Sequence, residues 1–416
     1  MASTSDAGPR AALRLIRSRR FGPYFAGNAL SAMGLWFHNL AAALLIFRLT
    51  GSEFLLGVLT VTQFAPTLFL VSVAGSAADR FDRQKVVVTA QVTAAVLGAG
   101  LALLAWVDAA PVPVVLVISL ALGVCSAFSA PAAAALIAAL VEPRDLASAV
   151  GLNSMTYNIA RAAGPALAAL VVSTLGIPAA FAVNAGSYLA LAIGVLVVSP
   201  PRVQARKAGA STRLRDTIAL IRREPRLGAY LLVVMVVGFA SDPINTLAPA
   251  FAHAFDRPDT FAGPIIGAFG AGAVLAAVLL AGRVAERRVL GMTMILLGAG
   301  IAAFSLVPSE EIGLLILVAA GFGYLSSNAG TTSRLQLEVD EAQRGRIMAL
   351  WGVAFLGLRP VASLLDGALA SAFGVRAAGV VLALPALAAG VVLLLGLRPH
   401  RLARRPAVAD PGARVG

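Results

Sequence analysis

The chain has 416 residues, of which 59% are hydrophobic and only 13% are charged, and its mean hydropathy is +0.87. Soluble domains carry about 25% charged residues, so this composition excludes an ordinary soluble protein and indicates an integral membrane protein. The formal net charge of +13 does not indicate a nucleic-acid partner, because most of the basic residues lie on one predicted side of the membrane, a bias that orients membrane helices.

Long apolar segments predict membrane-spanning helices. Three of them, Val86–Val107, Ile177–Val198 and Ala377–Leu397, contain no charged residue, and about 20 apolar residues are enough to cross a bilayer as a helix. The segments are apolar throughout, where a barrel strand would alternate. We predict an all-α membrane protein with twelve spans, near residues 24–48, 55–78, 86–107, 112–138, 149–174, 177–198, 228–252, 260–282, 289–308, 311–330, 347–372 and 375–397.

The basic residues predict the orientation of these helices. If both termini are cytoplasmic, all but five of the 33 Lys and Arg residues lie on the cytoplasmic side, which is the bias that orients membrane helices. The exceptions are Arg48, Arg257 and Arg376 on the opposite side and Arg161 and Arg359 within helices. Residues 1–20 are polar and basic, and they lack the apolar core of a cleaved signal peptide. We expect a multi-pass protein of a bacterial-type inner membrane.

A polar segment divides the predicted helices into two groups of six. We expect a basic N-terminus at 1–20, one bundle at 21–198, a central cytoplasmic loop at 199–227, a second bundle at 228–397 and a basic tail at 398–416. Within the loop, Thr212–Arg223 has apolar residues at helical spacing among arginines. This stretch is either a short amphipathic helix on the anionic inner leaflet or a solvated linker.

A short repeated motif relates the two groups. AGSAADR at residues 74–80 follows the second predicted helix, and AGRVAER at residues 281–287 follows the eighth. The motif aligns Gly75 with Gly282, Asp79 with Glu286, and Arg80 with Arg287. Both copies follow the second helix of a six-helix unit, so the two units have the same orientation. Such parallel repeats are typical of one large class of secondary transporters.

Several motifs resemble those of the major facilitator superfamily. The segment from Gly75 to Lys85 is similar to the superfamily's loop signature G-x-x-x-D-R-x-x-R-[RK], except that Gln84 occupies the last position and Lys85 follows it. Three further stretches resemble the drug- and siderophore-exporting branch, which includes enterobactin exporters and macrolide efflux proteins. They are Leu35-Trp-Phe with Phe47–Ser52, Leu152–Ala166, and Arg344–Trp351 with Gly357–Pro360.

The resemblance implies a conformational latch at the repeated motif. In the family, the acid equivalent to Asp79 holds helix 2 against helix 11 in the outward-facing state, and an anion is favoured at a helix N-terminus. Gly75 would allow a close approach to a neighbouring helix, and Arg80 and Arg83 would partner the carboxylate. Alternatively, these basic residues act only as topology signals. The second copy contributes the corresponding residues Glu286 and Arg287.

Ionisable residues inside membrane helices are costly, so each is a candidate functional residue. Asp242 and Asn245 lie in the seventh helix around Pro243, which places them either at a substrate or proton site or at the rim of the extracellular opening. Arg359 and Asp366 are two turns apart on one face of the eleventh helix, and Arg359 either lines the cavity with Asp366 or pairs with an acid elsewhere. The remaining candidates are Arg161, placed near the cytoplasmic end of the fifth helix by the resemblance, Trp36, His38 and Asn39 in the first helix, Gln63 in the second and Asn328 in the tenth.

The motifs that would indicate an enzyme or an ATP-driven pump do not occur in the sequence. It has no G-x-x-x-x-G-K-[ST] loop, and its three histidines and single cysteine, Cys125, do not form a metal-binding pattern. We therefore expect no cofactor, no metal and no catalysis, and a monomer. The resemblance implies export of small, partly hydrophobic compounds, of the drug or siderophore class, in exchange for protons. The alternatives are a lysophospholipid flippase or nutrient importer of the same fold, and a non-transporting receptor or accessory subunit.

Overall fold

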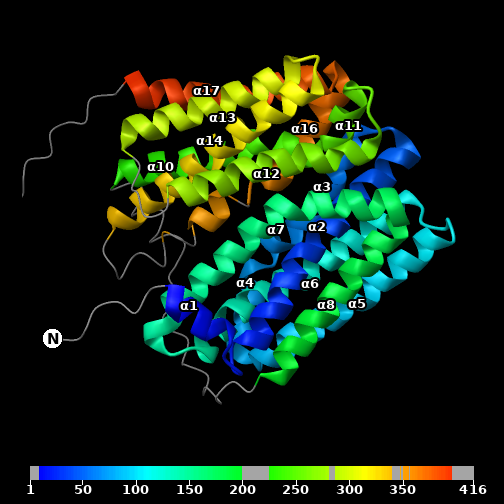
Figure 1. The fold of residues 1–416 in the computed structure, drawn as a ribbon, viewed down its shortest axis with the longest axis vertical. Coiled ribbons are helices and arrows are strands. Elements are labelled where there is room, and N and C mark those ends of the chain that lie inside the picture. Colours follow the sequence, from blue (N-terminus) through cyan, green and yellow to red (C-terminus); the bar gives the residue numbers. More distant parts are fainter. Residues whose placement is uncertain are drawn as a thin grey trace, which may run out of the picture.

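The computed structural model describes residues 9–198, 224–280, 286–339, 347, 350–355 and 357–395. In these residues all regular secondary structure is helical, and the helices form two bundles (Figure 1). The predicted central loop at 199–227 lies mostly outside the described residues, as does the basic stretch Thr212–Arg223.

The first bundle follows the chain from the N-terminus. Its helices are α1 (Pro9–Ile16), α2 (Gly22–Thr50), α3 (Glu53–Phe69), α4 (Val71–Arg80), α5 (Arg83–Trp106), α6 (Val112–Leu140), α7 (Leu146–Leu175) and α8 (Ile177–Val197). The second bundle contains α10 (Pro225–Thr246), α11 (Ala248–Ala254), the 3₁₀ turn η2 (Asp259–Phe261), α12 (Ala262–Leu279), α13 (Arg287–Leu306), α14 (Glu310–Leu337), α16 (Arg359–Phe373) and α17 (Val375–Leu395).

Ten helical segments of the described chain are long and apolar enough to cross a membrane. An eleventh, Pro143–Leu175, is bent by 41°, and the predicted second span is divided into α3 and α4 at Leu70. Pro165 accounts for the bend, because a proline removes one backbone donor and its ring clashes with the carbonyl four residues earlier, here that of Arg161, where α7 bends. Pro66 lies inside α3, four residues before Leu70, and the Leu70 N–H still donates to its carbonyl at 2.8 Å.

The two bundles are joined mainly at one side of the molecule. We call the side where α2 begins and α8 and α17 end the terminus side, and the side where α2 ends at Thr50 the far side. In Figure 1 the terminus side lies to the left and the far side to the right, where the bundles converge. The pairs α3–α16 and α7–α12 make the principal contacts between the bundles.

The hydrophobic core shows the same asymmetry. One large cluster contains residues of both bundles, including Phe47 and Leu56 from the first and Phe251 and Ile266 from the second. On the terminus side the buried apolar residues form separate clusters, one around α1, α5 and α6 in the first bundle and one around α10 and α14 in the second. The bundles therefore share a core at the far side and have their own cores at the terminus side.

Two glycines allow the tight contact at the far side. A Cβ at Gly57 in α3 would lie 2.3 Å from the carbonyl oxygen of Ser363 in α16, and a Cβ at Gly367 would lie 2.7 Å from that of Glu53. Real Cβ atoms essentially never approach an oxygen so closely, so only glycine permits this backbone contact. The α3–α16 seam is thus closed at the far side by direct packing of the two backbones.

Candidate functional site

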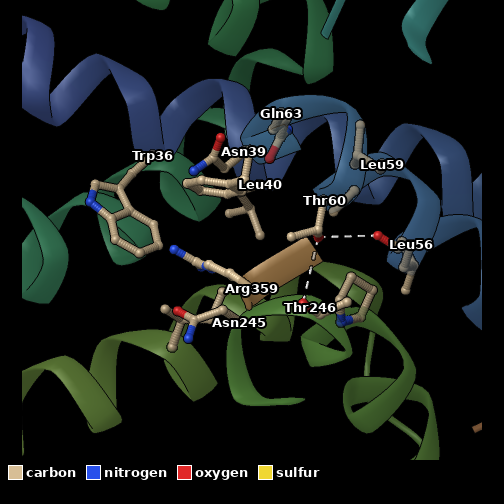
Figure 2. A pocket seen from close by; sticks show the side chains of 14 residues that line it. Trp36, Asn39, Leu40, Leu56, Leu59, Thr60, Gln63, Asn245, Thr246 and Arg359 are labelled. Carbon is tan, nitrogen blue, oxygen red and sulfur yellow. Dashed lines mark hydrogen bonds between the residues drawn. The ribbon is translucent and has the colours of Figure 1, made fainter. Parts of the chain in front are cut away.

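A cavity lies between the two bundles on the terminus-side of this seal. In this conformation the cavity is narrow, with a volume of about 30 Å³, and its wall combines α2 and α3 of the first bundle with α10, α11, α12 and α16 of the second. Figure 2 shows side chains from both bundles pointing toward one another across it. The lining residues are Trp36, Asn39, Leu40, Ala43, Leu56, Leu59, Thr60, Gln63, Phe64, Asn245, Thr246, Pro249, Ile266 and Arg359.

The positively charged side chain in the cavity wall, Arg359, forms an ion pair with a buried acid. The Nε of Arg359 donates to Oδ1 of Asp242 at 2.9 Å, and the Thr246 hydroxyl donates to Oδ2 of the same carboxylate at 3.2 Å. The Asp242 side chain is only 3% exposed, whereas that of Arg359 is 23% exposed. Its guanidinium lies over the Phe64 ring at 4.2 Å from the centroid. A buried carboxylate needs both a charge partner and hydrogen bonds, and Asp242 has them.

This pairing decides between the two predicted partners of Arg359. The arginine pairs with an acid on another helix, α10, rather than lining the cavity together with Asp366. Asp366 is fully buried, does not line the cavity, and neither carboxyl oxygen has a hydrogen-bond partner among the described residues. Its carboxyl interacts with that of Asp242. Two carboxyl groups and one guanidinium therefore form a compact cluster between α10 and α16.

Two amide groups in the cavity wall have unused hydrogen-bonding capacity. The Nδ2 of Asn245 donates to the Ser241 carbonyl at 3.0 Å, but its buried Oδ1 has no partner among the described residues. The buried Nε2 of Gln63 also has none. An unsatisfied buried polar group costs about 1–3 kcal/mol, so a ligand that bonds to these groups would recover this free energy. The donor lies in the wall formed by the first bundle and the acceptor in the wall formed by the second.

Arg161 lies midway along α7, not near its terminus-side end as the resemblance implied. Proline 165 and Gly164 shape the helix here, and Trp36 of α2 packs directly against Gly164. The Arg161 guanidinium donates to the Tyr324 hydroxyl of α14 at 2.5 Å and lies 4.4 Å from the centre of that ring. Arg161 therefore reaches from the first bundle to the second, beside the tryptophan of the cavity wall.

The other predicted residues divide between the cavity and the bundle cores. Trp36, Asn39, Gln63, Asn245 and Arg359 line the cavity. His38 does not: it is buried inside the first bundle, 3.4 Å from the Ser119 hydroxyl and beside the Phe181 ring. Asn328 is buried in α14, where its side-chain and main-chain oxygens accept from Thr332, and it is not part of the lining.

The repeated motif contributes the end of α4 and the starts of α5 and α13. In this conformation Gly75 is not packed against a neighbouring helix, because no described atom outside its own helix lies within 4 Å of where its Cβ would be. The bundles are joined at the far side, and α4 packs within its own bundle, chiefly on α6. Arg80 is exposed, Arg83 begins α5, and the side chain of Asp79 lies outside the described residues. Glu286 is the exposed residue before α13, which Arg287 begins.

The structure shows ion pairs and hydrogen bonds of three arginines that the sequence motifs did not predict. Arg48 at the end of α2 forms an ion pair with Asp259 of η2, joining the bundles at the far side, with a second hydrogen bond from Nη2 to Oδ1 at 3.0 Å. Arg257 pairs with Glu310, and Arg376 donates to the carbonyls of Ser305, Val307 and Ala254. These three arginines are the basic residues that were predicted on the side opposite the termini. That exception to the charge bias was the sequence signal that could have indicated partners for them.

Comparison with known proteins identifies the family. A family model described as transmembrane secretion effector, a group within the major facilitator superfamily, matches residues 11–406. The chain belongs to this family. It is a multi-pass membrane transporter, and the predicted fold class and resemblance are confirmed. The family and its relatives are transporters, which are not enzymes.

Among curated relatives, the transporter is 24% identical to macrolide efflux protein A of Streptococcus pyogenes over 373 residues, which cover 86% of this chain and 91% of that protein. It is 28% identical over 388 residues to the enterobactin exporter EntS of Shigella boydii serotype 4, covering 88% and 91% of the two chains. Both relatives are named as efflux or export proteins.

Solved structures with a similar fold have much lower sequence identity. A bacterial homologue of the human lysosomal transporter Spinster, in an inward-facing and unoccupied conformation, superposes with a TM-score of 0.72 at 14% identity, covering 94% of this chain and 97% of that one. The nucleoside transporter NupG gives 0.66 at 14% identity, with 92% and 98% coverage. At these identities the likeness establishes the twelve-helix fold alone.

Proposed function

We propose that this transporter exports small, partly hydrophobic organic compounds, of the drug or siderophore class, from the cytoplasm in exchange for protons. The observation that carries the proposal is the cavity between two bundles that are joined at the far side, with an ion pair at its wall. Rocking of two parallel repeats about a central site is the general mechanism of such folds. The export functions named for the two curated relatives support the same direction.

The terminus side faces the cytoplasm in this proposal. The basic residues concentrate there, and this bias orients helices in bacterial membranes. The far side then faces outward, and the conformation described here is the inward-facing one. Substrate enters the cavity from the cytoplasm and leaves after the far-side contacts open and the terminus side closes.

The proton is carried by the cluster of Asp242, Asp366 and Arg359. A charge in the membrane interior is expensive unless it is paired, and this cluster has two carboxyl groups for one guanidinium. A proton on the acid pair balances the charge of the cluster, and its loss leaves two negative charges beside one positive charge. Proton binding and release therefore change the strength of the contact between α10 and α16, which the rocking motion can use.

The repeated motif closes the terminus side in the opposite state. The outward-facing conformation brings α4 toward the part of the eleventh span that precedes α16, where Asp79 reaches the helix and Gly75 permits the approach. Arg80 and Arg83 hold the Asp79 carboxylate ionised, and Glu286 and Arg287 occupy the corresponding positions of the second copy. This latch is disengaged when the far side is sealed, in accord with the open surroundings of Gly75.

Efflux measurements test the proposal. Cells that overproduce the transporter are loaded with a panel of dyes and antibiotics, and efflux is followed with and without a protonophore. We expect efflux that collapses when the proton gradient is removed. Asp366→Asn should lower proton-driven efflux by about tenfold or more, because the amide cannot take up or release the proton.

The matched control is Glu142→Gln, since this exposed acid pairs with Arg144 away from the cavity and undergoes the same chemical change. It should transport normally. Efflux that is unaffected by the protonophore would contradict proton coupling, and normal proton dependence in both Asp366→Asn and Asp242→Asn would remove the cluster as its carrier.

A further inference from the structure

We propose that the cargo of the cavity is an organic acid: a compound with an aromatic or otherwise apolar body, an anionic group that binds Arg359, and a neighbouring hydrogen-bond donor. The inference rests on the proposed function, because it concerns the same cavity. It narrows the broad class of partly hydrophobic compounds to anions, and it excludes cationic amines as the preferred cargo.

The distribution of charge at the junction of the bundles favours an anion. Two guanidinium groups reach across it, Arg359 toward Phe64 and Arg161 toward Tyr324. Asp242 balances Arg359, but no carboxylate among the described side chains pairs with Arg161. Asp366 is fully buried without a hydrogen-bond donor, an environment that an ionised carboxylate tolerates poorly. With a proton on Asp366, the junction has one uncompensated positive charge.

Arg359 has capacity for an anionic ligand without giving up its partner. Among the described residues only its Nε donates a hydrogen bond, to Asp242, while the side chain is 23% exposed and extends toward the cavity in Figure 2. A guanidinium offers five donors in a planar fork that matches a carboxylate or similar anion in two parallel hydrogen bonds. The two terminal nitrogens are therefore available for the acid group of a ligand.

The same wall offers a cation no charge partner. No described residue of the lining is an aspartate or glutamate, and the nearby Asp242 is 3% exposed and already bound by Arg359 and Thr246. An ammonium group in the cavity would face the Arg359 guanidinium across an apolar space, and like charges repel strongly where water is scarce. The cavity should therefore bind anions in preference to cations.

The remaining polar atoms and rings define the rest of the ligand. Gln63 presents a free donor, Nε2, and Asn245 a free acceptor, Oδ1, which suit an anion that carries an adjacent hydroxyl or N–H group. The faces of Trp36 and Phe64 provide an apolar and aromatic wall, and stacking on such rings favours a planar body. A hydroxylated aromatic acid satisfies all of these groups together.

Equilibrium binding to the purified, full-length transporter tests the inference with one scaffold in three charge states. The probes are 3-hydroxy-2-naphthoate, its methyl ester and the corresponding aminomethyl compound, measured by isothermal titration calorimetry. We expect the acid to bind at least about tenfold more tightly than the ester, since a charge-assisted pair with arginine is lost, and the amine to bind more weakly still.

Variants connect this preference to Arg359. Arg359→Gln removes the cation but leaves Asp242 unpaired, so the companion Arg359→Gln/Asp242→Asn keeps a neutral hydrogen-bonding pair that can fold. Both should bind acid and ester within about twofold of each other. Equal or tighter binding of the ester or the amine by the unaltered protein would overturn the inference, as would no binding by any probe, or an acid preference that persists in the double variant.

Transport in proteoliposomes distinguishes failure of the inference from failure of the proposed function. With an imposed pH gradient, uptake of the ester or amine but not of the acid would refute the acid class while preserving proton-driven export. Tight acid binding without gradient-driven movement of any probe would support the class of ligand and refute the exchange mechanism.

Discussion

The two ends of the span formed by α3 and α4 have different surroundings. At the far side, Gly57 and Gly367 place the backbones of α3 and α16 in direct contact, and a Cβ at Gly57 would lie 2.3 Å from a carbonyl oxygen. Toward the terminus side, Gly75 lies in α4, and no atom of another described element lies within 4 Å of its missing Cβ. Among the described residues, close backbone contact with the second bundle is therefore found at Gly57 and not at Gly75.

The difference indicates how a single pair of helices can serve two states. Gly57 and Gly75 lie toward opposite ends of the span formed by α3 and α4. We infer that only one of them is in contact with the second bundle at a time, because rocking two rigid bundles closes one end as it opens the other. In this view, the packing at Gly57 stabilises the inward-facing state and the motif around Gly75 stabilises the outward-facing one. Substitutions at the two glycines should then have opposite effects on the conformational equilibrium.

The largest effect is expected for Gly57→Leu. The new side chain collides with the Ser363 carbonyl in the far-closed state, and overpacking of this kind costs about 1–3 kcal/mol. We expect the ratio of far-closed to far-open molecules to fall by about 5- to 150-fold. Spin labels at Ala109→Cys and Ile312→Cys, both exposed at the far side, in a Cys125→Ser background, should report a longer distance across that side.

Gly100→Leu is the matched control. Gly100 is also a helical glycine, but nothing lies within 4 Å of its Cβ position, so the same change should leave the spin-label distance unaltered. An unchanged distance in Gly57→Leu would show that the far-side contact is not what holds this state.

The second prediction concerns Gly75→Leu. In the conformation described here the leucine has free space, and a better helix former replaces glycine, which should raise the stability of this state by about 0.5–1 kcal/mol. In the outward-facing state it blocks the proposed approach of α4 to the eleventh span. We therefore expect transport to fall by about tenfold while the melting temperature stays equal or rises, measured by efflux and by thermal unfolding of the purified protein.

The opposite outcome is informative. Efflux at the normal rate by Gly75→Leu would refute the latch, because the side chain would then have space in both states. Lower thermal stability together with lost efflux would instead indicate a folding defect, which Gly100→Leu should not share.

The helices of this transporter were predictable because each apolar segment must satisfy its backbone hydrogen bonds within itself in lipid. The bend of α7 was also encoded locally, since Pro165 follows it by about one helical turn. The break between α3 and α4 was not anticipated, since they were expected as one span. The 41° bend of the α7 segment depends on how neighbouring helices pack around it.

The site was predictable only as a set of residue types. The cost of a charge in the membrane singled out Asp242, Arg359 and Asp366, but two partners for Arg359 remained open. The choice depends on a contact between residues 117 positions apart, which no local pattern specifies. Similarly, His38 and Asn39 are sequence neighbours, yet one faces the core of its bundle and the other the cavity, because adjacent helical residues point in different directions.

The smallest effect is expected for the ion pair that joins the bundles at the far side. Arg48 and Asp259 are 211 positions apart, and the Arg48 side chain is 46% exposed. Exposed ion pairs contribute about 0.2–1 kcal/mol, so Arg48→Gln should shift the same spin-label equilibrium toward the far-open state by only about 1.5- to 5-fold. The shift should shrink at 1 M salt, where screening extends to about 3 Å.

The ion pair between Arg257 and Glu310 is the control for this small effect. Arg257 and Glu310 also pair at the far side, but both belong to the second bundle, so their attraction does not change when the bundles rock. Arg257→Gln should therefore leave the equilibrium unaltered, and Arg48→Gln/Asp259→Asn should match Arg48→Gln alone. If Arg257→Gln shifted the equilibrium as much as Arg48→Gln, the effect would come from lost surface charge and not from a contact between bundles. The backbone packing at Gly57 would then be the stronger of the two far-side contacts by an even wider margin.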